Sequence, residues 1–272
     1  MCRTNACARE SHPSLADAME DERVVESSSS TKIIVRTSSS SRASTSTTGV
    51  DRRAETVTFR ATSRRGGGDD EDEDEDVVVT VRQNRGAIAV DPTARWVWDS
   101  CPLVCEYLCD EENVDGLVRG RRVVELGAGT GMPGLVCSKL GAASVTLTDL
   151  PSELALLEEN VKLNARPGDS PVCVRACAWG ELDDETRTYD TVVVSDVLYH
   201  QPVRVLEALA NTLRALVDPD NGIVVFAYHF RENLMHDSQF FEFIDRAFDD
   251  RARVSFEDAP NVWLYEWTLK KR

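Results

Sequence analysis

The chain has 272 residues, of which 42% are hydrophobic, and its formal net charge is −16 at pH 7. This apolar content suffices for one large α/β domain, and no run approaches the roughly 20 apolar residues of a membrane span. Because phosphate binding depends on Lys and Arg, the acidic balance disfavours nucleic acid as the main partner. A protein partner with a basic target site fits better.

The first 76 residues are rich in Ser and Thr and end in eight consecutive acids, Asp69–Asp76. Such a composition buries too little apolar surface to offset chain entropy, so we expect residues 1–76 to form a disordered tail. Its Ser, Thr and Arg content is typical of transit peptides, but the acidic cluster Glu20–Glu22 is not. Organelle import is therefore the less favoured alternative.

The cysteines follow two regular spacings. Cys101, Cys105 and Cys109 recur every four residues, which would place them along one stripe of a helix. Cys173 and Cys177 would share one face of a strand. Neither set forms a C-x-x-C pair, so buried reduced thiols are favoured over a metal site, and we expect no metal. Reduced thiols indicate a reducing compartment, with the cytoplasm favoured and the nucleus as a second location.

The ordered region is expected to cover residues 77–272. Two short apolar runs, 77–82 and 87–90, flank a polar tetrapeptide and predict a β-hairpin. A helix is predicted next, over residues 102–109, and Asp99 or Ser100 would cap its start. These elements form an N-terminal β-hairpin/helix extension to the rest of the domain.

From Arg121 onward, strands and helices alternate regularly. The predicted strands are 123–126, 144–148, 172–177, 191–195, 223–228, 253–256 and 262–269, and the predicted helices are 132–140, 152–164, 203–217 and 232–248. Alternation with continuous Val-rich strands predicts a parallel, doubly wound sheet. The last two strands have no helix between them and predict an antiparallel hairpin. The fold class is therefore α/β, with a mostly parallel sheet of seven strands.

Glycines occupy alternate positions after the first strand of this sheet, in Glu125-Leu-Gly127-Ala128-Gly129-Thr-Gly131. Glycines in a strand-to-helix turn let the backbone pass close to a ligand, which is expected at the carboxyl ends of the strands. Residues 129–134 also satisfy the G-x-G-x-x-G spacing of dinucleotide-binding folds, but a lone match is weak. An acid such as Glu125 suits a cofactor with an α-amino group. Both alternatives stay open on the loop alone.

Further candidates follow the next three strands. Asp149 can accept hydrogen bonds from both hydroxyls of a ribose, although it could instead cap the next helix. Trp179 offers a large apolar surface to a purine. Asp196 and Tyr199 follow a run of apolar residues. An unpaired acid in a core would be costly, so a site role for Asp196 is favoured.

The motifs occur in one order: Trp98-Asp99, the E-x-G-x-G-x-G loop, Thr148-Asp149, Glu159–Asn164, Trp179-Gly180 and Ser195-Asp196-Val-Leu-Tyr199. This series, which covers residues 77–272, resembles methyltransferase family 16. That family comprises Rossmann-like, seven-strand enzymes that use S-adenosyl-L-methionine, and many of its members methylate lysines of chaperones, ATPases and translation factors. The resemblance implies a monomeric protein-lysine N-methyltransferase with a protein substrate.

The resemblance also implies residue roles. Asp196 and Tyr199 would be catalytic, with Asp196 accepting a hydrogen bond from the incoming amine, and His200 would lie on the surface at the mouth of the site. The cofactor would be bound by Trp98, Glu125, Gly127, Ala128, Gly129, Asp149, Trp179 and the backbone of Ser195. The alternatives are methylation of arginine, histidine or a small molecule, a non-catalytic cofactor-binding module, and an NAD-dependent oxidoreductase.

Overall fold

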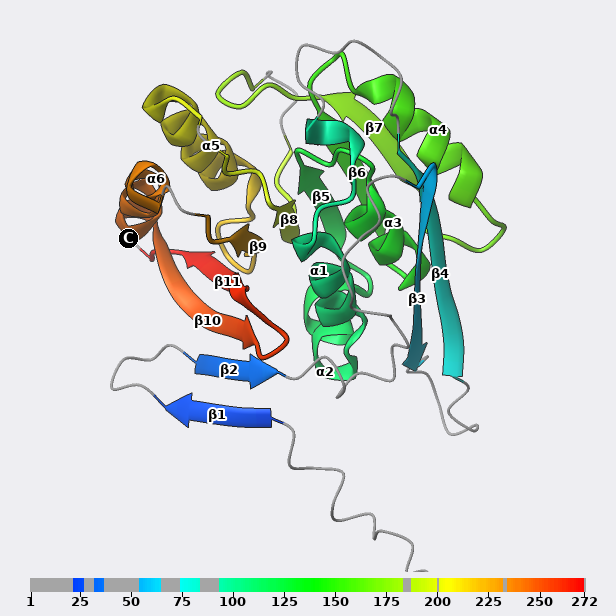
Figure 1. Ribbon diagram of the computed structural model, residues 1–272, viewed down its shortest axis with the longest axis horizontal. Coiled ribbons are helices and arrows are strands. Elements are labelled where there is room, and N and C mark those ends of the chain that lie inside the picture. Colours follow the sequence, from blue (N-terminus) through cyan, green and yellow to red (C-terminus); the bar gives the residue numbers. More distant parts are fainter. Residues whose placement is uncertain are drawn as a thin grey trace, which may run out of the picture.

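The computed structural model describes residues 22–26, 32–36, 54–64, 74–83, 93–182, 187–199, 201–231 and 234–271. Among these residues, nine strands form one sheet in the order β1-β2-β10-β11-β9-β8-β5-β6-β7, and β3 and β4 form a separate two-stranded sheet (Figure 1). Strands β1 (Glu22–Glu26) and β2 (Lys32–Arg36) extend the large sheet beyond β10.

The core of the large sheet matches the predicted alternation closely. Its strands are β5 (Arg122–Leu126), β6 (Ser144–Asp149), β7 (Val172–Ala176), β8 (Thr191–Ser195), β9 (Ile223–His229), β10 (Phe248–Phe256) and β11 (Ala259–Leu269). The helices are α1 (Ser100–Cys109), α2 (Glu111–Asn113), α3 (Met132–Lys139), α4 (Leu154–Asn164), α5 (Val203–Leu216) and α6 (Leu234–Ala247). Short helical turns occur at Thr93–Arg95 and Val114–Val118.

Strand pairing confirms the predicted fold class. Strands β5 to β9 pair in parallel, and β11 pairs antiparallel with both β9 and β10. Along β8, Val193 belongs to the core beneath α1 and α3, whereas Val192 and Val194 belong to the core beneath α5. Both faces of the sheet are therefore covered, which explains why its strands are continuously apolar.

The connection from β7 to β8 fixes where a ligand can bind. The chain builds β5, β6 and β7 in one direction and then returns to place β8 on the other side of β5. The strand order therefore reverses between β5 and β8. In open α/β sheets, ligands bind outside the carboxyl ends of the strands at this reversal point.

An N-terminal hairpin is present, but the part that the structure describes joins β4 to an earlier strand. Strand β4 (Asp74–Arg82) pairs antiparallel with β3 (Thr56–Arg64), and residues 87–90, the predicted partner, lie outside the described residues. The predicted boundary at residue 77 is wrong, because β3 lies within the predicted tail and Phe59 is only 2% exposed. The alternation of apolar and polar residues along β3 supports a half-buried strand, but the surrounding Ser/Thr-rich composition concealed it.

Two asparagine side chains of α4 hydrogen-bond to the backbone of β4, in the way that the backbone of a neighbouring strand would. The Asn164 amide accepts from Thr80 N at 2.9 Å and donates to Thr80 O at 2.7 Å. The Asn160 amide does the same with Arg82, at 2.7 and 3.2 Å. Residues four apart share a helix face and residues two apart share a strand edge, so the two spacings match. This pairing explains the Glu159–Asn164 motif structurally.

The cysteines are free where the structure describes them. Cys101, Cys105 and Cys109 are buried along α1, as predicted, whereas Cys173 is exposed, so the expectation of burial is wrong there. Within the described ranges, no group of three or more His, Cys, Asp or Glu residues is arranged to hold a metal ion. The described helices include none of sufficient length and apolarity to cross a membrane.

Candidate functional site

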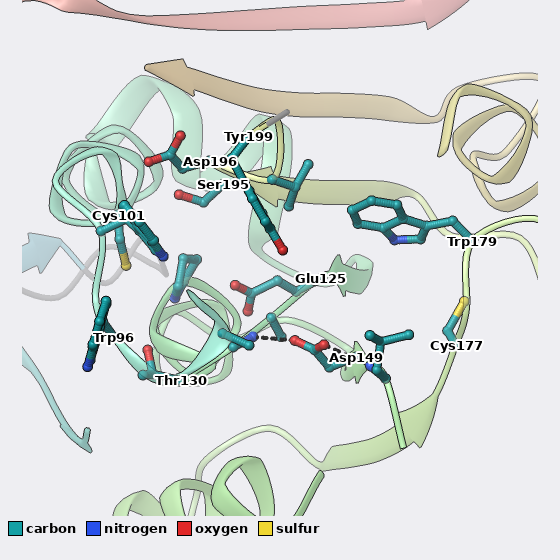
Figure 2. A pocket seen from close by; sticks show the side chains of 18 of the residues that line it. Trp96, Cys101, Glu125, Thr130, Asp149, Cys177, Trp179, Ser195, Asp196 and Tyr199 are labelled. Carbon is teal, nitrogen blue, oxygen red and sulfur yellow. Dashed lines mark hydrogen bonds between the residues drawn. The ribbon is translucent and has the colours of Figure 1, made fainter. Parts of the chain in front are cut away.

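A cavity of about 400 Å³ lies at the carboxyl ends of β5, β6 and β8 (Figure 2). Its volume is in the range of small-molecule sites. The predicted site residues all line it: Trp98, Glu125, Gly127, Ala128, Gly129, Asp149, Trp179, Ser195, Asp196 and Tyr199. His200 lies outside the described residues. The parallel sheet gathers residues that are up to about a hundred positions apart in the chain, because parallel strands end at one edge.

The glycine loop permits close approach of other backbone segments. A Cβ atom at Gly129 would lie 2.7 Å from the carbonyl oxygen of Ala94, and one at Gly127 would lie 2.9 Å from Val197 Cγ1. Both glycines have positive φ, at 54° and 62°. A side chain at either position would be strained as well as crowded. The loop is therefore enclosed by the segment before α1 and by the segment after β8.

Asp149 fastens this loop to the end of β6. Its Oδ2 atom accepts a hydrogen bond from Gly129 N at 2.7 Å, and its Oδ1 atom accepts one from Leu150 N at 2.7 Å. The alternative role as a helix cap is not realised, because α4 begins only at Leu154. A carboxylate oxygen can accept a second hydrogen bond, so this arrangement remains compatible with ribose hydroxyls.

Glu125 lies buried at the base of the cavity, with 2% exposure. Its Oε2 atom accepts a hydrogen bond from Gly134 N at 2.8 Å, in the first turn of α3. Burial raises the pKa of Glu125 to about 8; the bond from Gly134 opposes the rise, and the charge of Asp149 adds to it. A cation at this end of the cavity would favour the ionised carboxylate. Glu125 therefore suits the amino group of a ligand.

Asp196 is held in a strained and asymmetric environment. Among the described residues, Asp196 is the one residue other than glycine that has a positive φ, 54°. Its Oδ2 atom accepts a hydrogen bond from Arg231 Nη2 at 2.6 Å, whereas its buried Oδ1 has no hydrogen-bond partner in the described part of the chain. Burial raises the pKa of Asp196, and the ion pair with Arg231 opposes that rise. Strain and an unsatisfied acceptor are both typical of functional sites.

The loop that carries Tyr199 is shaped by Gln201. The Gln201 side chain accepts a hydrogen bond from Tyr199 N at 2.7 Å and donates one to the Val197 carbonyl. In Figure 2, Tyr199 points into the cavity, between Asp196 and Trp179. In the same view, Asp149 and Trp179 lie at the end of the cavity away from Asp196. The two ends of the cavity therefore carry different side chains, with Asp196 at one end and Asp149 and Trp179 at the other.

The structure corrects the predicted start of α1. The Asp99 side chain makes no capping hydrogen bond in the described residues, and the Ser100 hydroxyl instead contacts the Ser195 hydroxyl at 3.1 Å. The segment before α1 is fixed by other contacts. Gln83 Oε1 accepts from Val97 N at 2.9 Å, and Arg95 pairs with Glu153 at 3.0 Å. This segment forms one wall of the cavity.

Sequence reasoning missed Arg231, Gln83 and Gln201. Arg231 lies two residues beyond β9, which is the neighbour of β8 in the sheet. Its place after a strand end was the available signal, but the strand order needed to interpret it was not yet known. Gln83 and Gln201 act through side-chain bonds to backbone atoms, and no spacing pattern marks them.

Comparison with known proteins gives one consistent result. The model of a family described as lysine methyltransferase matches residues 76–247. EEF1A lysine methyltransferase 3 of Mus musculus is 38% identical over 156 residues, which is 56% of this chain and 62% of that protein. Protein N-lysine methyltransferase METTL21A of Xenopus tropicalis is 32% identical over 178 residues, or 65% of this chain and 78% of that protein.

The similarity covers only part of the first of these relatives. The chain spans less than two thirds of the mouse protein, and 54% of the EEF1A lysine methyltransferase 3 of Xenopus tropicalis, to which it is 40% identical. Among solved structures, the glycopeptide N-methyltransferase MtfA matches with a TM-score of 0.50 and 17% identity, over 63% of this chain and 90% of that one. This last similarity concerns the fold alone.

Proposed function

The chain belongs to the lysine methyltransferase family, and we propose that it transfers a methyl group from S-adenosyl-L-methionine to a lysine side chain of a protein substrate. One observation carries this proposal. A single cavity combines an end suited to an amino-acid-bearing nucleoside with an end where Asp196 offers an unsatisfied acceptor. The first end binds a cofactor, and the second receives a nucleophile.

The residues present fit the cofactor at three points. The carboxylate of Glu125 would pair with its amino group, and Asp149 would accept hydrogen bonds from its ribose. The indole of Trp179 would pack on its adenine. Gly127 and Gly129 line the cavity at positions where the neighbouring segments leave no room for a side chain. When bound, the cofactor supplies a methyl group on a positively charged sulfur, which the lysine nitrogen accepts as the S–CH₃ bond breaks.

The other end of the cavity orients the lysine. Asp196 Oδ1 would accept a hydrogen bond from the incoming amine, which would satisfy a buried atom that otherwise lacks a partner. Tyr199 would shape the channel around the lysine stem, and Trp98 would pack against the cofactor beside it, so that water is excluded. Correct alignment of two reacting groups supplies much of the rate enhancement in reactions of this kind.

The first substrate to test is EEF1A, because two similar proteins carry EEF1A lysine methyltransferase in their names. Purified full-length protein would be incubated with radiolabelled S-adenosyl-L-methionine and either purified EEF1A or a lysate of cells that lack the protein. The labelled band would be excised and its modified residue mapped by mass spectrometry. We expect label on a lysine.

The same experiment separates the alternatives. Label on arginine or histidine would contradict lysine specificity while retaining a protein methyltransferase. Label confined to small molecules would contradict a protein substrate. Binding of S-adenosylhomocysteine without any transfer would indicate a non-catalytic module, and binding of NAD in competition with it would indicate an oxidoreductase.

A further inference from the structure

Arg231 connects two separate segments at the Asp196 end of the cavity. Its Nη2 atom donates to Asp196 Oδ2 at 2.6 Å, and its Nη1 atom donates to the Leu198 carbonyl at 3.0 Å. Its guanidinium carbon lies 5.3 Å from the centre of the Trp98 ring, which is a cation–π distance. One rigid, planar group therefore fixes the acid, the loop that follows it and an aromatic wall.

This contact makes the two oxygens of Asp196 unequal. The Asp196 side chain is fully buried, whereas the Arg231 side chain is 25% exposed. Oδ2 is occupied by the guanidinium, and Oδ1 has no partner in the described residues. A hydrogen-bond donor that reaches Asp196 would therefore meet a defined oxygen in a defined orientation, instead of a freely rotating carboxylate.

The ion pair also changes the charge that an incoming amine would meet. Methyl transfer requires a nitrogen with a free electron pair, but a free lysine has a pKa of about 10.4. A bare carboxylate within about 4–6 Å would raise that pKa further, by about 1–3 units, and would hold the unreactive ammonium form. A guanidinium already paired with the carboxylate opposes this effect.

We propose that Arg231 is a positioning residue for methyl transfer, which orients Asp196 toward the substrate amine and prevents Asp196 from holding that amine in its protonated form. This role rests on the proposed function. In the part of the chain that the structure describes, the charged or titratable groups that act on Asp196 are Arg231, two residues beyond β9, His229 at the end of β9 and Asp99 before α1. Arg231 is the group among these that makes a direct bond to the carboxylate.

The test compares two substitutions of Arg231 with a matched control. Arg231→Gln removes the charge, and Arg231→Lys keeps the charge but loses the planar fork. Arg246→Gln is the control, because Arg246 also stacks on an aromatic ring, Phe243, at 5.3 Å, but lies on α6 and does not line the cavity. The substrate is the protein and residue identified by the labelling experiment. The rates are measured from about pH 6 to about pH 10.

For Arg231→Gln, we expect kcat to fall about 100-fold and the rising limb of the pH–rate profile to move about 1 unit toward higher pH. The KM for the cofactor and the calorimetric affinity for S-adenosylhomocysteine should stay within about twofold. In Arg231→Lys, the rising limb of the pH–rate profile should lie near its wild-type position, because the charge is retained. The kcat of Arg231→Lys should stay below that of the wild type, because the fixed geometry of the guanidinium is lost. Arg246→Gln should leave all these quantities unchanged.

An Arg231→Gln variant with a wild-type kcat and pH limb would overturn this role, and a faster variant would show that Arg231 blocks the site instead. If Arg231→Gln lowers both the affinity for S-adenosylhomocysteine and the melting temperature, Arg231 has a structural role only. If Arg231→Gln does not fold, the kcat of Arg231→Lys decides: a lowered kcat with unchanged S-adenosylhomocysteine affinity supports the role, and a wild-type kcat overturns it. Wild-type protein that binds S-adenosylhomocysteine but labels no substrate would contradict the proposed function itself, so the two failures are distinguishable.

Discussion

The carboxylate of Asp149 accepts a hydrogen bond from the backbone nitrogen of Gly129 at 2.7 Å, and this bond joins the end of β6 to the glycine loop after β5. The same side chain also accepts from Leu150 N. Asp149 therefore shapes the loop before any ligand arrives. A ligand that hydrogen-bonds to Asp149 would bind to a side chain whose orientation is already fixed.

Replacing Asp149 should weaken cofactor binding through two losses at once. Asp149→Ala removes the acceptor for the ribose and releases the Gly129 N–H, and each hydrogen bond to a charged group contributes about 1.5–3 kcal/mol. We expect the affinity for S-adenosylhomocysteine to fall at least about 100-fold by calorimetry. Asp149→Asn keeps one acceptor oxygen and should lose less. Equal affinities of Asp149→Ala and the wild type would exclude the ribose role.

Glu125 should make the stability of the ligand-free protein depend on pH. Its pKa is raised to about 8 in the folded state by burial, from 4.5. Between these values the folded state keeps a proton that the unfolded state releases, so stability falls as the pH rises from 4.5 to 8. Between these pH values the free energy of unfolding of the wild type should decrease by an amount on the order of a few kcal/mol, and Glu125→Gln should abolish this decrease.

Urea unfolding of the ligand-free protein at about pH 5 and about pH 8 measures this effect. Glu158→Gln, on the exposed face of α4, is the matched control and should retain the wild-type pH dependence. An unchanged slope in Glu125→Gln would show that the acid does not titrate in this window. The variant should also bind S-adenosylhomocysteine more weakly, since the amide cannot pair with an ammonium group as a carboxylate does.

Asp196 should matter for transfer and not for cofactor binding. Asp196→Asn keeps the shape of the side chain but weakens the pair with Arg231, and we expect methyl transfer to fall about 100-fold or more. Asp196→Ala should abolish transfer. The affinity for S-adenosylhomocysteine should largely survive in both variants, because Asp149 and Trp179 lie at the other end of the cavity. Full activity in Asp196→Ala would remove this residue from the mechanism.

The two asparagines of α4 should separate stability from cofactor binding. Asn164→Ala leaves Thr80 N–H and C=O without their partner and should cost about 1–3 kcal/mol in the free energy of unfolding. Asn160→Ala should cost a similar amount. Asn160 also donates to the Thr130 carbonyl at 3.0 Å, within the glycine loop, so only its loss should weaken S-adenosylhomocysteine binding as well.

Chemical denaturation and calorimetry on both asparagine variants check this pair of outcomes. Each variant serves as the control for the other, because the two side chains make the same kind of contact with β4. If both variants lose cofactor affinity equally, the hairpin and not the Thr130 contact supports the loop. If neither loses stability, the side-chain pairing with β4 makes no net contribution.

The sequence alone determined the central fold and the positions of several residues that line the candidate site. Strand–helix alternation is a local pattern, and it placed β5 to β9 and α3 to α6 within a few residues of their bounds. The positions of Glu125, Asp149 and Trp179 followed because each lies at or just after the end of a strand. In a parallel sheet that position is enough to assign a residue to the ligand-binding edge.

Only the tertiary structure decided the partner of β4, the contacts of Asp196 and the importance of Arg231. Residues 65–73 separate β3 from β4, and no local pattern specifies which strand pairs with which. Arg231 is 35 residues away from Asp196 in the chain, and the two side chains meet because β9 lies beside β8 in the sheet. Local periodicity reports which face of an element is buried, whereas pairing and ion contacts depend on how distant elements pack, and that information is present only in the folded chain.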